Sequence, residues 1–373
     1  MADIMTSTIS LDQRDADLTT SREAAAPRDR IADDMAMLRA AVELTRDLNP
    51  PKPIIYWTDL LLSAGIGYAA LAAAILLASP GWAVLAGVVA VLALYRAGSF
   101  IHELTHIKHS AVPWFRFGWN LLIGLPLMVP SFTYEGVHTL HHARTRYGTA
   151  EDPEYLPLAL MKPWSLPLFI MASLVAPVAL LFRFAVLSPL AAISPAIRTI
   201  VIGRLSALSI NPAFERRAPE GALLRQWRWQ AAGCSVFAIA LLGSVAAGIV
   251  PLRGFLIFMA IASGVAVLNQ VRTLVAHLWE NEGEAMTVTA QYLDSVNVPP
   301  PALLPALWAP VGLRYHALHH LLPSLPYHAL GEAHRRLAGS LDANSPYHRA
   351  NYPGLPGLVR KIVISTMRAR PAA

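Results

Sequence analysis

Three short clusters hold eight of the chain's thirteen histidines, and their spacing suits metal binding. Within a cluster the histidines recur at intervals of three or four residues, so a helix would present their imidazoles on one face with Cβ atoms about 5–6 Å apart. Neutral imidazole is the commonest protein ligand for transition metals. One such pair is weak evidence, but three clusters in one chain predict a metal site. The ligands so predicted are His102, His106, His138, His141, His142, His316, His319 and His320.

The number and kind of these histidines bear on which metal they would bind. A catalytic zinc uses about three protein ligands, so this set is better divided between two ions with about four or five ligands each. A nitrogen-rich set without thiolates suits iron, zinc or copper. Carboxylate-bridged di-iron bundles use paired Glu-x-x-His motifs, whereas here Glu103 lies between histidines without a matching set. We therefore expect a histidine-rich site, for which redox-active iron explains the ligand number better than zinc.

The composition favours a membrane protein. Hydrophobic residues make up 55% of the chain and charged residues 14%, well below the roughly 25% charged residues of a soluble domain. The net charge is +6, but no basic stripe is interleaved with aromatics outside the membrane-flanking segments. We therefore expect the positively charged residues to contact an anionic lipid surface, and we expect no nucleic acid as a partner. The single cysteine, Cys234, excludes disulfide frameworks, cysteine-rich zinc sites and iron–sulfur ligation.

Long apolar runs predict one membrane-embedded unit that four helices cross. Each run has about 20 residues or more, enough for a hydrocarbon core of about 30 Å. The expected spans are residues 54–78, 82–101, 229–250 and 252–275. Prolines interrupt the apolar stretches 110–137, 165–187 and 188–203. We expect these three stretches to form interfacial, re-entrant or in-plane helices rather than crossings.

Polar segments flank this unit. Residues 1–50 form a polar N-terminal segment, of which 1–30 has the composition of a disordered region. Apolar positions recur at helical spacing over 31–48 and predict an amphipathic helix, which lies either on the membrane or on the protein. The membrane domain is expected at 51–340 and a cytosolic tail at 341–373.

The order of the spans places the histidine clusters on one side of the membrane. Two hairpins with very short outer turns return the chain each time to the side that holds both termini and all three clusters. Among the thirty Lys and Arg residues only Arg253 falls at an outer turn, so this side is expected to be cytoplasmic. The predicted fold is an all-α membrane protein: four transmembrane helices, interfacial helices and a cytosolic cap holding a di-metal site. The low lysine and high arginine and alanine content favours a bacterial inner membrane.

The three clusters resemble the histidine boxes of the integral-membrane fatty acid desaturase and hydroxylase superfamily. Residues 102–106 resemble its first box, HxxxH. Residues 138–142, with the acidic stretch 151–155 after them, resemble the second, HxxHH, and residues 316–320 resemble the third. The resemblance covers about residues 54–340.

This resemblance implies a cap that holds a non-haem di-iron centre, with the eight cluster histidines as iron ligands. A further histidine just past the fourth helix completes the family's set, and His277 matches it in position. The family can place an asparagine one turn before that residue, where this chain has Thr273, and Asn269 lies two turns before it.

Several other polar residues are expected near the site. His109 is a tenth candidate ligand, although a place on the surface or beside the ligands suits it better, as it does His328 and His334. Ligating histidines usually give their other N–H to a carboxylate or carbonyl. We expect Asp152 and Asp294 to take that role. Three further acidic residues fall near the expected cap: Glu154, Glu280 and Glu282.

The function predicted from this resemblance is an O₂-dependent desaturase of a membrane lipid or acyl chain. A di-iron centre, reduced by a separate donor such as a ferredoxin, would remove two hydrogens from a substrate lying in a tunnel. The basic stretch 216–228 suits either docking of that donor or contact with lipid. The oligomeric state is left open.

Other functions are compatible with the same residues. A hydroxylase or ketolase of a fatty acid, alkane or carotenoid would share the scaffold and the histidine spacing. The residues after the second and third boxes favour the desaturase. A metal transporter would place ligands at the membrane midplane, where these spans hold almost none, and a structural zinc protein is the weakest alternative.

Overall fold

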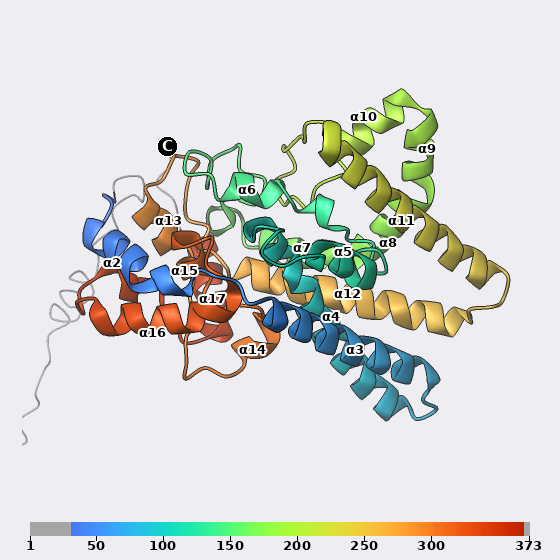
Figure 1. The fold of residues 1–373 in the computed structure, drawn as a ribbon, viewed down its shortest axis with the longest axis horizontal. Helices are drawn as coiled ribbons and strands as arrows, with labels where there is room; N and C mark the ends of the chain where they lie inside the picture. The colour runs from blue at the N-terminus through green and yellow to red at the C-terminus, as the bar shows by residue number, and fades with distance from the viewer. Residues whose placement is uncertain (1–30, 369–373) are drawn as a thin grey trace, which may run out of the picture.

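The computed structural model describes residues 31–368, so the segment 1–30 and the last five residues lie outside it. The described part is all-helical, with isolated β-bridges in place of any strand. Long helices extend toward one end of the molecule, and short helices form a cap at the other (Figure 1). The expectation of an all-α architecture is confirmed.

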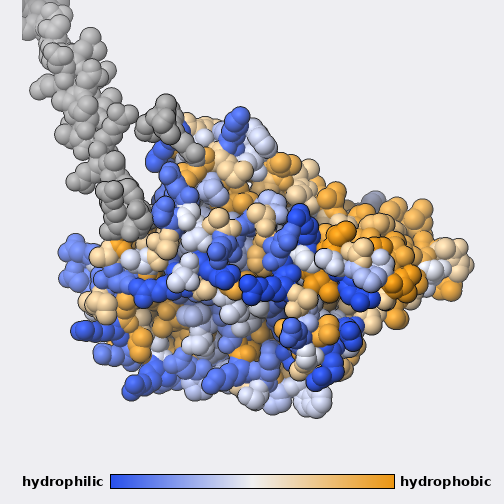
Figure 2. All heavy atoms as spheres, turned by 90° about the horizontal axis from the view of Figure 1, so that it is seen from above, coloured by the Kyte–Doolittle hydropathy of each residue, from blue (hydrophilic) through white to orange (hydrophobic). Residues whose placement is uncertain are grey.

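Four long helices correspond to the four predicted spans. They are α3 (Pro53–Leu76), α4 (Pro80–His106), α11 (Gly221–Ala246) and α12 (Leu252–Leu274). α3 and α4 both begin at a proline, whose missing N–H costs nothing in the first turn of a helix. Large apolar side chains stay exposed along them, including Ile66, Val84 and Val236. Figure 2 shows hydrophobic residues gathered over one end of the molecule and hydrophilic residues over the other, as a membrane-embedded bundle requires.

A close contact joins α3 to α4. A Cβ atom on Gly67 would lie 2.7 Å from Leu94 Cδ2, so only glycine lets the two helices approach this far. Arg96 pairs with Asp59 at 2.6 Å, and Tyr327 of the cap donates to the same carboxylate at 2.9 Å. The charge of Arg96 is therefore neutralised within the protein, and the pair ties the bundle to the cap.

A fifth apolar segment runs over Ser165–Ile193 and is long enough to cross a membrane by length and composition. It is broken into α7 (Ser165–Met171), η6 (Ala172–Val175), α8 (Ala176–Phe182), η7 (Arg183–Leu187) and α9 (Ser188–Ile193). α10 (Pro195–Gly203) follows it.

The surroundings of α10 indicate how this segment lies. Gly203 O accepts from Arg216 N at 2.8 Å, and the Arg216 side chain donates to Phe132 O at 2.6 Å, close to the second histidine cluster. The nine residues of α10 span about 13.5 Å, less than half of a hydrocarbon core. Because the chain returns to the cap through α10, a helix too short to cross the hydrocarbon core, the expected re-entrant or in-plane arrangement of Ser165–Ile193 is favoured over a fifth crossing.

Short helices make up the cap. Helix α2 (Met35–Thr45) buries Met37 and Ala41 in a core shared with α16 (Leu330–Ser340), so it packs on the protein, one of the two readings its sequence allowed. The other α-helices are α5 (Phe115–Trp119), α6 (Val137–His141), α13 (Val288–Asp294), α14 (Pro305–Trp308), α15 (His316–Leu321) and α17 (Leu355–Met367). The remaining short turns are η2 (Arg46–Leu48), η3 (Asn120–Gly124), η4 (Ser131–Thr133), η5 (Leu158–Leu160), η8 (Tyr327–Ala329) and η9 (Pro346–Ala350).

Candidate metal centre

All nine predicted ligands meet where the long helices enter the cap, and they form two separate groups. Within each group the ligand nitrogens lie within 4.8 Å of one another, close enough to hold one metal ion. The first group consists of His102, His106, His138, His142 and His319, and the second of His141, His277, His316 and His320. They come from the end of α4, from α6, from the segment after α12 and from α15.

The HxxHH motif explains how one short helix serves both groups. Adjacent residues point about 100° apart around a helix, whereas residues four apart share a face. His138 and His142 therefore turn to the first group, and His141 between them turns to the second. In α15 the assignment is reversed, because His316 and His320 belong to the second group and His319 to the first.

The spacing of the nitrogens fits ligands of a metal ion. The Nε2 atoms of His138 and His142 are 3.0 Å apart, and His319 Nε2 is 3.1 Å from His106 Nε2. In the second group the Nε2 atoms of His316 and His277 are 3.0 Å apart. Two ligands at right angles, each about 2.1 Å from an ion, would be about 3.0 Å apart.

The burial of the histidines and the lack of hydrogen-bond partners for some of their nitrogens also indicate metal binding. Both ring nitrogens of His102 are buried without a hydrogen-bond partner among the described residues, which is costly unless another group satisfies them. Burial, followed by the neighbouring imidazoles, holds the pKa of five histidines well below the usual range. They are His138, His142, His316, His319 and His320. Neutral imidazole is the form that binds metal, so the donor set fits two ions.

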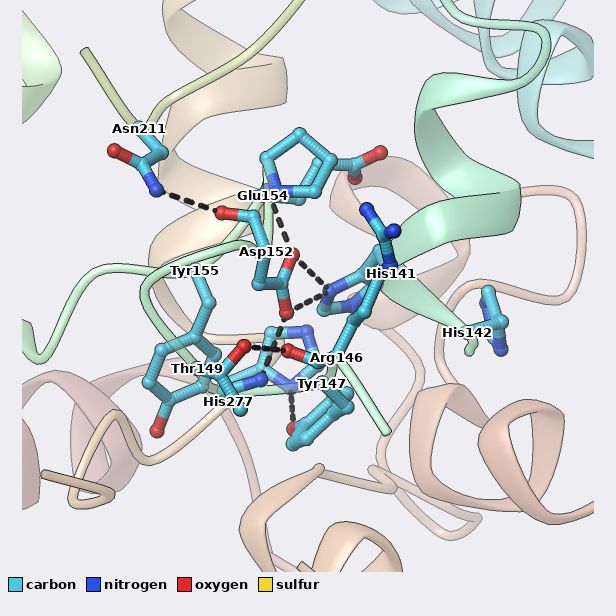
Figure 3. Close-up of polar contacts among 12 residues, drawn as sticks. His141, His142, Arg146, Tyr147, Thr149, Asp152, Glu154, Tyr155, Asn211 and His277 are labelled. Carbon is cyan, nitrogen blue, oxygen red and sulfur yellow. Dashed lines mark hydrogen bonds and ion pairs between the residues drawn. The ribbon is translucent and has the colours of Figure 1, made fainter. Parts of the chain in front are cut away.

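Carboxylates orient one histidine of each group. His141 Nδ1 lies 2.9 Å from Asp152 Oδ2 and 3.0 Å from Oδ1, and Asp152 is fully buried (Figure 3). Asp152 also accepts from the backbone N–H groups of Gly148 and Glu154, each at 2.8 Å. Burial opposes the charged form of His141, but the Asp152 carboxylate outweighs it and raises the pKa of His141. Asp152 thus takes the expected role.

Glu154 orients a ligand of the first group, a role that no pattern in the sequence indicates. His138 Nδ1 is 3.1 Å from both carboxylate oxygens of Glu154 and 2.9 Å from the Tyr134 hydroxyl. Tyr134 donates in turn to Glu154 Oε2 at 2.8 Å. Burial raises the pKa of the Glu154 carboxyl to about 7, although the charge of His141 and the Tyr134 hydrogen bond oppose this.

Asp294 supports His277 through the hydroxyl of Tyr147. His277 Nδ1 lies 2.8 Å from the Tyr147 hydroxyl (Figure 3) and 3.2 Å from Ser295 Oγ. Tyr147 and Tyr155 both donate to Asp294 Oδ2, each at 3.0 Å. No sequence pattern pointed to Tyr147, because 130 residues separate it from His277.

The remaining histidines singled out in the sequence lie outside both groups. His109 is exposed. His328 Nε2 accepts from Lys52 N at 3.1 Å, and His334 Nδ1 is 2.8 Å from the Tyr347 hydroxyl. Glu103 is buried beside the first group and accepts from the Tyr56 hydroxyl at 2.6 Å. His328, His334 and Glu103 thus hold parts of the fold around the site through these hydrogen bonds.

A cavity of about 780 Å³ reaches both groups of histidines. His102 and His138 of the first group and His141, His277 and His316 of the second lie in its wall. Apolar side chains from several segments cover most of the rest, among them Ile123, Leu127, Leu156, Leu168, Phe169, Ala262, Val265 and Leu313. The volume of this cavity is within the range of known small-molecule sites. A long apolar molecule in it would lie alongside both groups of histidines.

An all-α membrane protein with two histidine groups beside an apolar cavity belongs to the histidine-box class of membrane oxidoreductases. The comparisons agree: the family model described as Fatty acid desaturase matches residues 80–352, and the chain belongs to that family. The chain is 49% identical over 326 residues to a protein named Ceramide hydroxylase from Caulobacter vibrioides (strain NA1000 / CB15N). That match covers 87% of this chain and 93% of the relative. No solved structure matches.

These findings confirm the predicted superfamily and the class of enzyme. The protein is an integral-membrane oxidoreductase of the desaturase and hydroxylase superfamily. The narrower prediction of a desaturase is not favoured, because the relative with 49% identity is named a hydroxylase.

Proposed function

We propose that this protein is an O₂-dependent, di-iron hydroxylase that acts on a membrane lipid of the ceramide class. The observation that carries the proposal is the pair of buried, all-histidine groups opening onto one apolar cavity. The reaction type and the lipid class rest on the relative named Ceramide hydroxylase, whose length is matched over 93%. The alternative is a fatty acyl desaturase, which the description of the family model supports.

The nine histidines are proposed as the ligands of two non-haem irons, one for each group. Bound iron would supply the activation of O₂ against an unreactive C–H bond. The chain's own residues fix the ligands: Asp152 on His141 and Glu154 on His138 hold each Nδ1, so that each Nε2 turns to its group. These carboxylates are buried or nearly so, which keeps water from competing for the imidazoles.

The cavity wall positions the substrate. Apolar residues of α4, α7 and α12 would hold an acyl chain against the face formed by His102 and His316. Hydroxylation and desaturation both begin with removal of a hydrogen from such a chain, so the wall decides which carbon is presented. Whether hydroxylation or desaturation follows then depends on where the second reacting position lies relative to the irons.

A separate reductant, such as a ferredoxin, is part of the proposal, and an exposed arginine face is its suggested docking site. Arg217 is exposed just before α11, and Arg225 and Arg228 are exposed in the first turns of this helix. Arg216 is unsuited to docking, because its guanidinium lies over the Trp227 ring at 4.0 Å and donates to the carbonyls of Phe132 and Ser206. This face, both termini and the site are proposed to be cytoplasmic.

The lipids of cells with and without the gene product test this proposal. A ceramide that gains one oxygen atom in its presence supports the hydroxylase, whereas an acyl chain that loses two hydrogens supports the desaturase. His319→Ala removes a proposed ligand and should abolish either product while leaving the amount of membrane-inserted protein unchanged. Unaltered lipids, or full activity of His319→Ala, would contradict the proposal.

A further inference from the structure

A buried arginine lies in the cavity wall next to the candidate metal centre. Arg272 belongs to the last turn of α12 and is 8% exposed. It lines the cavity together with His102, His277 and His316. Burial, followed by the charges of His277 and Arg272, lowers the pKa of His316, so the guanidinium lies close to the histidines.

The guanidinium is incompletely satisfied. Arg272 Nε is buried and has no hydrogen-bond partner among the described residues, and none of the ion pairs formed within that part includes Arg272. The Tyr95 hydroxyl donates to Trp308 O at 3.0 Å and can accept from another N–H of the guanidinium, which leaves Nε as the donor without a partner. A buried cation with an unused donor is costly at membrane depth, and such residues usually serve function.

Arg183 shows how the same chain treats a buried arginine with a structural role. Arg183 is 6% exposed, and its Nε donates to Leu205 O at 2.5 Å. Its Nη1 donates to Ser188 Oγ at 3.3 Å. Arg183 Nε therefore donates to an oxygen of the protein, whereas Arg272 Nε has no such acceptor among the described residues.

We propose that Arg272 binds the amide carbonyl oxygen of the lipid substrate and thereby sets which carbon reaches the metals. Arginine presents five N–H donors and no acceptor, so it recognises a group that only accepts. Glu154 lines the same cavity and already holds His138, and a carboxyl group at this place favours a neutral carbonyl over an anionic head group. The identity of the amide rests on the proposed function.

The position of Arg272 has a consequence for the product. A carbonyl held by Arg272, in the cavity wall that also holds His102, His277 and His316, keeps the start of the acyl chain, or of the base, beside the metals. The new hydroxyl should therefore lie near the amide linkage rather than at the far end of a long chain. If the amide were held at the distant end of the cavity instead, the new hydroxyl would lie far from the amide linkage.

A binding experiment tests this without turnover. The probes are a ceramide brominated on its acyl chain and its thioamide analogue, in which sulfur, a weak acceptor, replaces the carbonyl oxygen. Bromine quenches tryptophan fluorescence, and Trp119, Trp164 and Trp279 line the cavity. The purified full chain should bind the amide about 10- to 100-fold more tightly than the thioamide, the range expected for a hydrogen bond to a charged group.

Three variants separate recognition from structure. Arg272→Met should bind the amide as weakly as the thioamide while its thioamide affinity stays unchanged. Arg272→Lys keeps the charge without the planar fork and should show an intermediate preference. Arg253→Met is the matched control, because Arg253 is an exposed arginine at the opposite end of α12, and it should behave as the native chain does.

Other results would overturn the inference. Equal losses for both lipids in Arg272→Met would show a structural role, and a retained preference would show that another residue holds the carbonyl. If Arg272→Met fails to fold, an unchanged preference in Arg272→Lys counts against the proposal and a reduced one supports it. A native chain that binds neither lipid would sink the ceramide assignment itself, which is a different failure from loss of the Arg272 effect.

Discussion

At the scale of single residues, Asp152 and Glu154 each orient one histidine, and the two histidines belong to different groups. Asp152 holds His141 and Glu154 holds His138. The two carboxylates lie two positions apart, and Glu154 N donates to Asp152 Oδ1 at 2.8 Å, so the short turn fixes both at once. Carboxylates in this position set the tautomer and direction of a ligating imidazole.

Asp152→Asn should weaken metal binding at the second group alone. The amide keeps the shape but loses the charge that orients His141, a change that typically costs about 10- to 100-fold in metal affinity. Competition with a chelator would measure it, and Glu151→Gln, at an exposed neighbouring carboxylate, is the control. Equal losses at both groups would instead indicate collapse of the turn.

The nine proposed ligands could be predicted from the sequence because helical spacing and family resemblance both depend on local patterns. The residues that orient them could not all be found in this way. Glu154 was one of several acidic residues without a distinguishing pattern. Tyr147 reaches His277 across 130 residues, a contact that only the folded cap creates.

At the scale of helices, the α3–α4 contact depends on a glycine. Gly67→Ala would push a methyl group against Leu94 and should destabilise the protein by about 1–3 kcal/mol, the usual cost of overpacking. Gly65→Ala on the same helix meets nothing within 4 Å and should be neutral, or stabilising by up to about 1 kcal/mol. Thermal unfolding in detergent would measure both, and equal effects of the two substitutions would contradict the packing described.

His334 in helix α16 should make the stability of the cap depend on pH. Burial, followed by the charges of Arg314 and His348, lowers the pKa of His334 to about 4. The unfolded chain binds this proton near pH 6.5, so stability is full above about 6.5 and falls as the pH drops toward about 4. His334→Gln removes the titration and should flatten this part of the melting-temperature profile. An identical slope in both proteins would exclude His334 as the source.

The four long helices could be predicted because each contains an apolar run long enough to cross a membrane, although α11 begins at Gly221, before the run expected at 229–250. The segment Ser165–Ile193 shows where such reasoning weakens, since its hydropathy suits a crossing while its prolines and the short return through α10 do not. The docking of α2 had two readings because an amphipathic stripe suits membrane or protein equally. Only packing against α16 distinguishes them.

At the scale of the whole molecule, the two long hairpins bring every candidate ligand to one side of the bundle. Single cysteines should report this topology, because the native Cys234 is buried and silent. With an impermeant thiol reagent on intact cells, Ser79→Cys in the turn between α3 and α4 should react. Asn344→Cys in the cap should react only after the cells are opened. The reverse pattern would place the site on the outer face.

The central claim is that two groups of histidines hold two irons, and the metal content of the purified protein tests it most directly. The account predicts about two irons per chain, in line with the two groups. It also predicts about one iron in His319→Ala, which disrupts the first group, and about one in His316→Ala, which disrupts the second. Zinc in place of iron, or a single ion per native chain that both variants lose, would contradict the account.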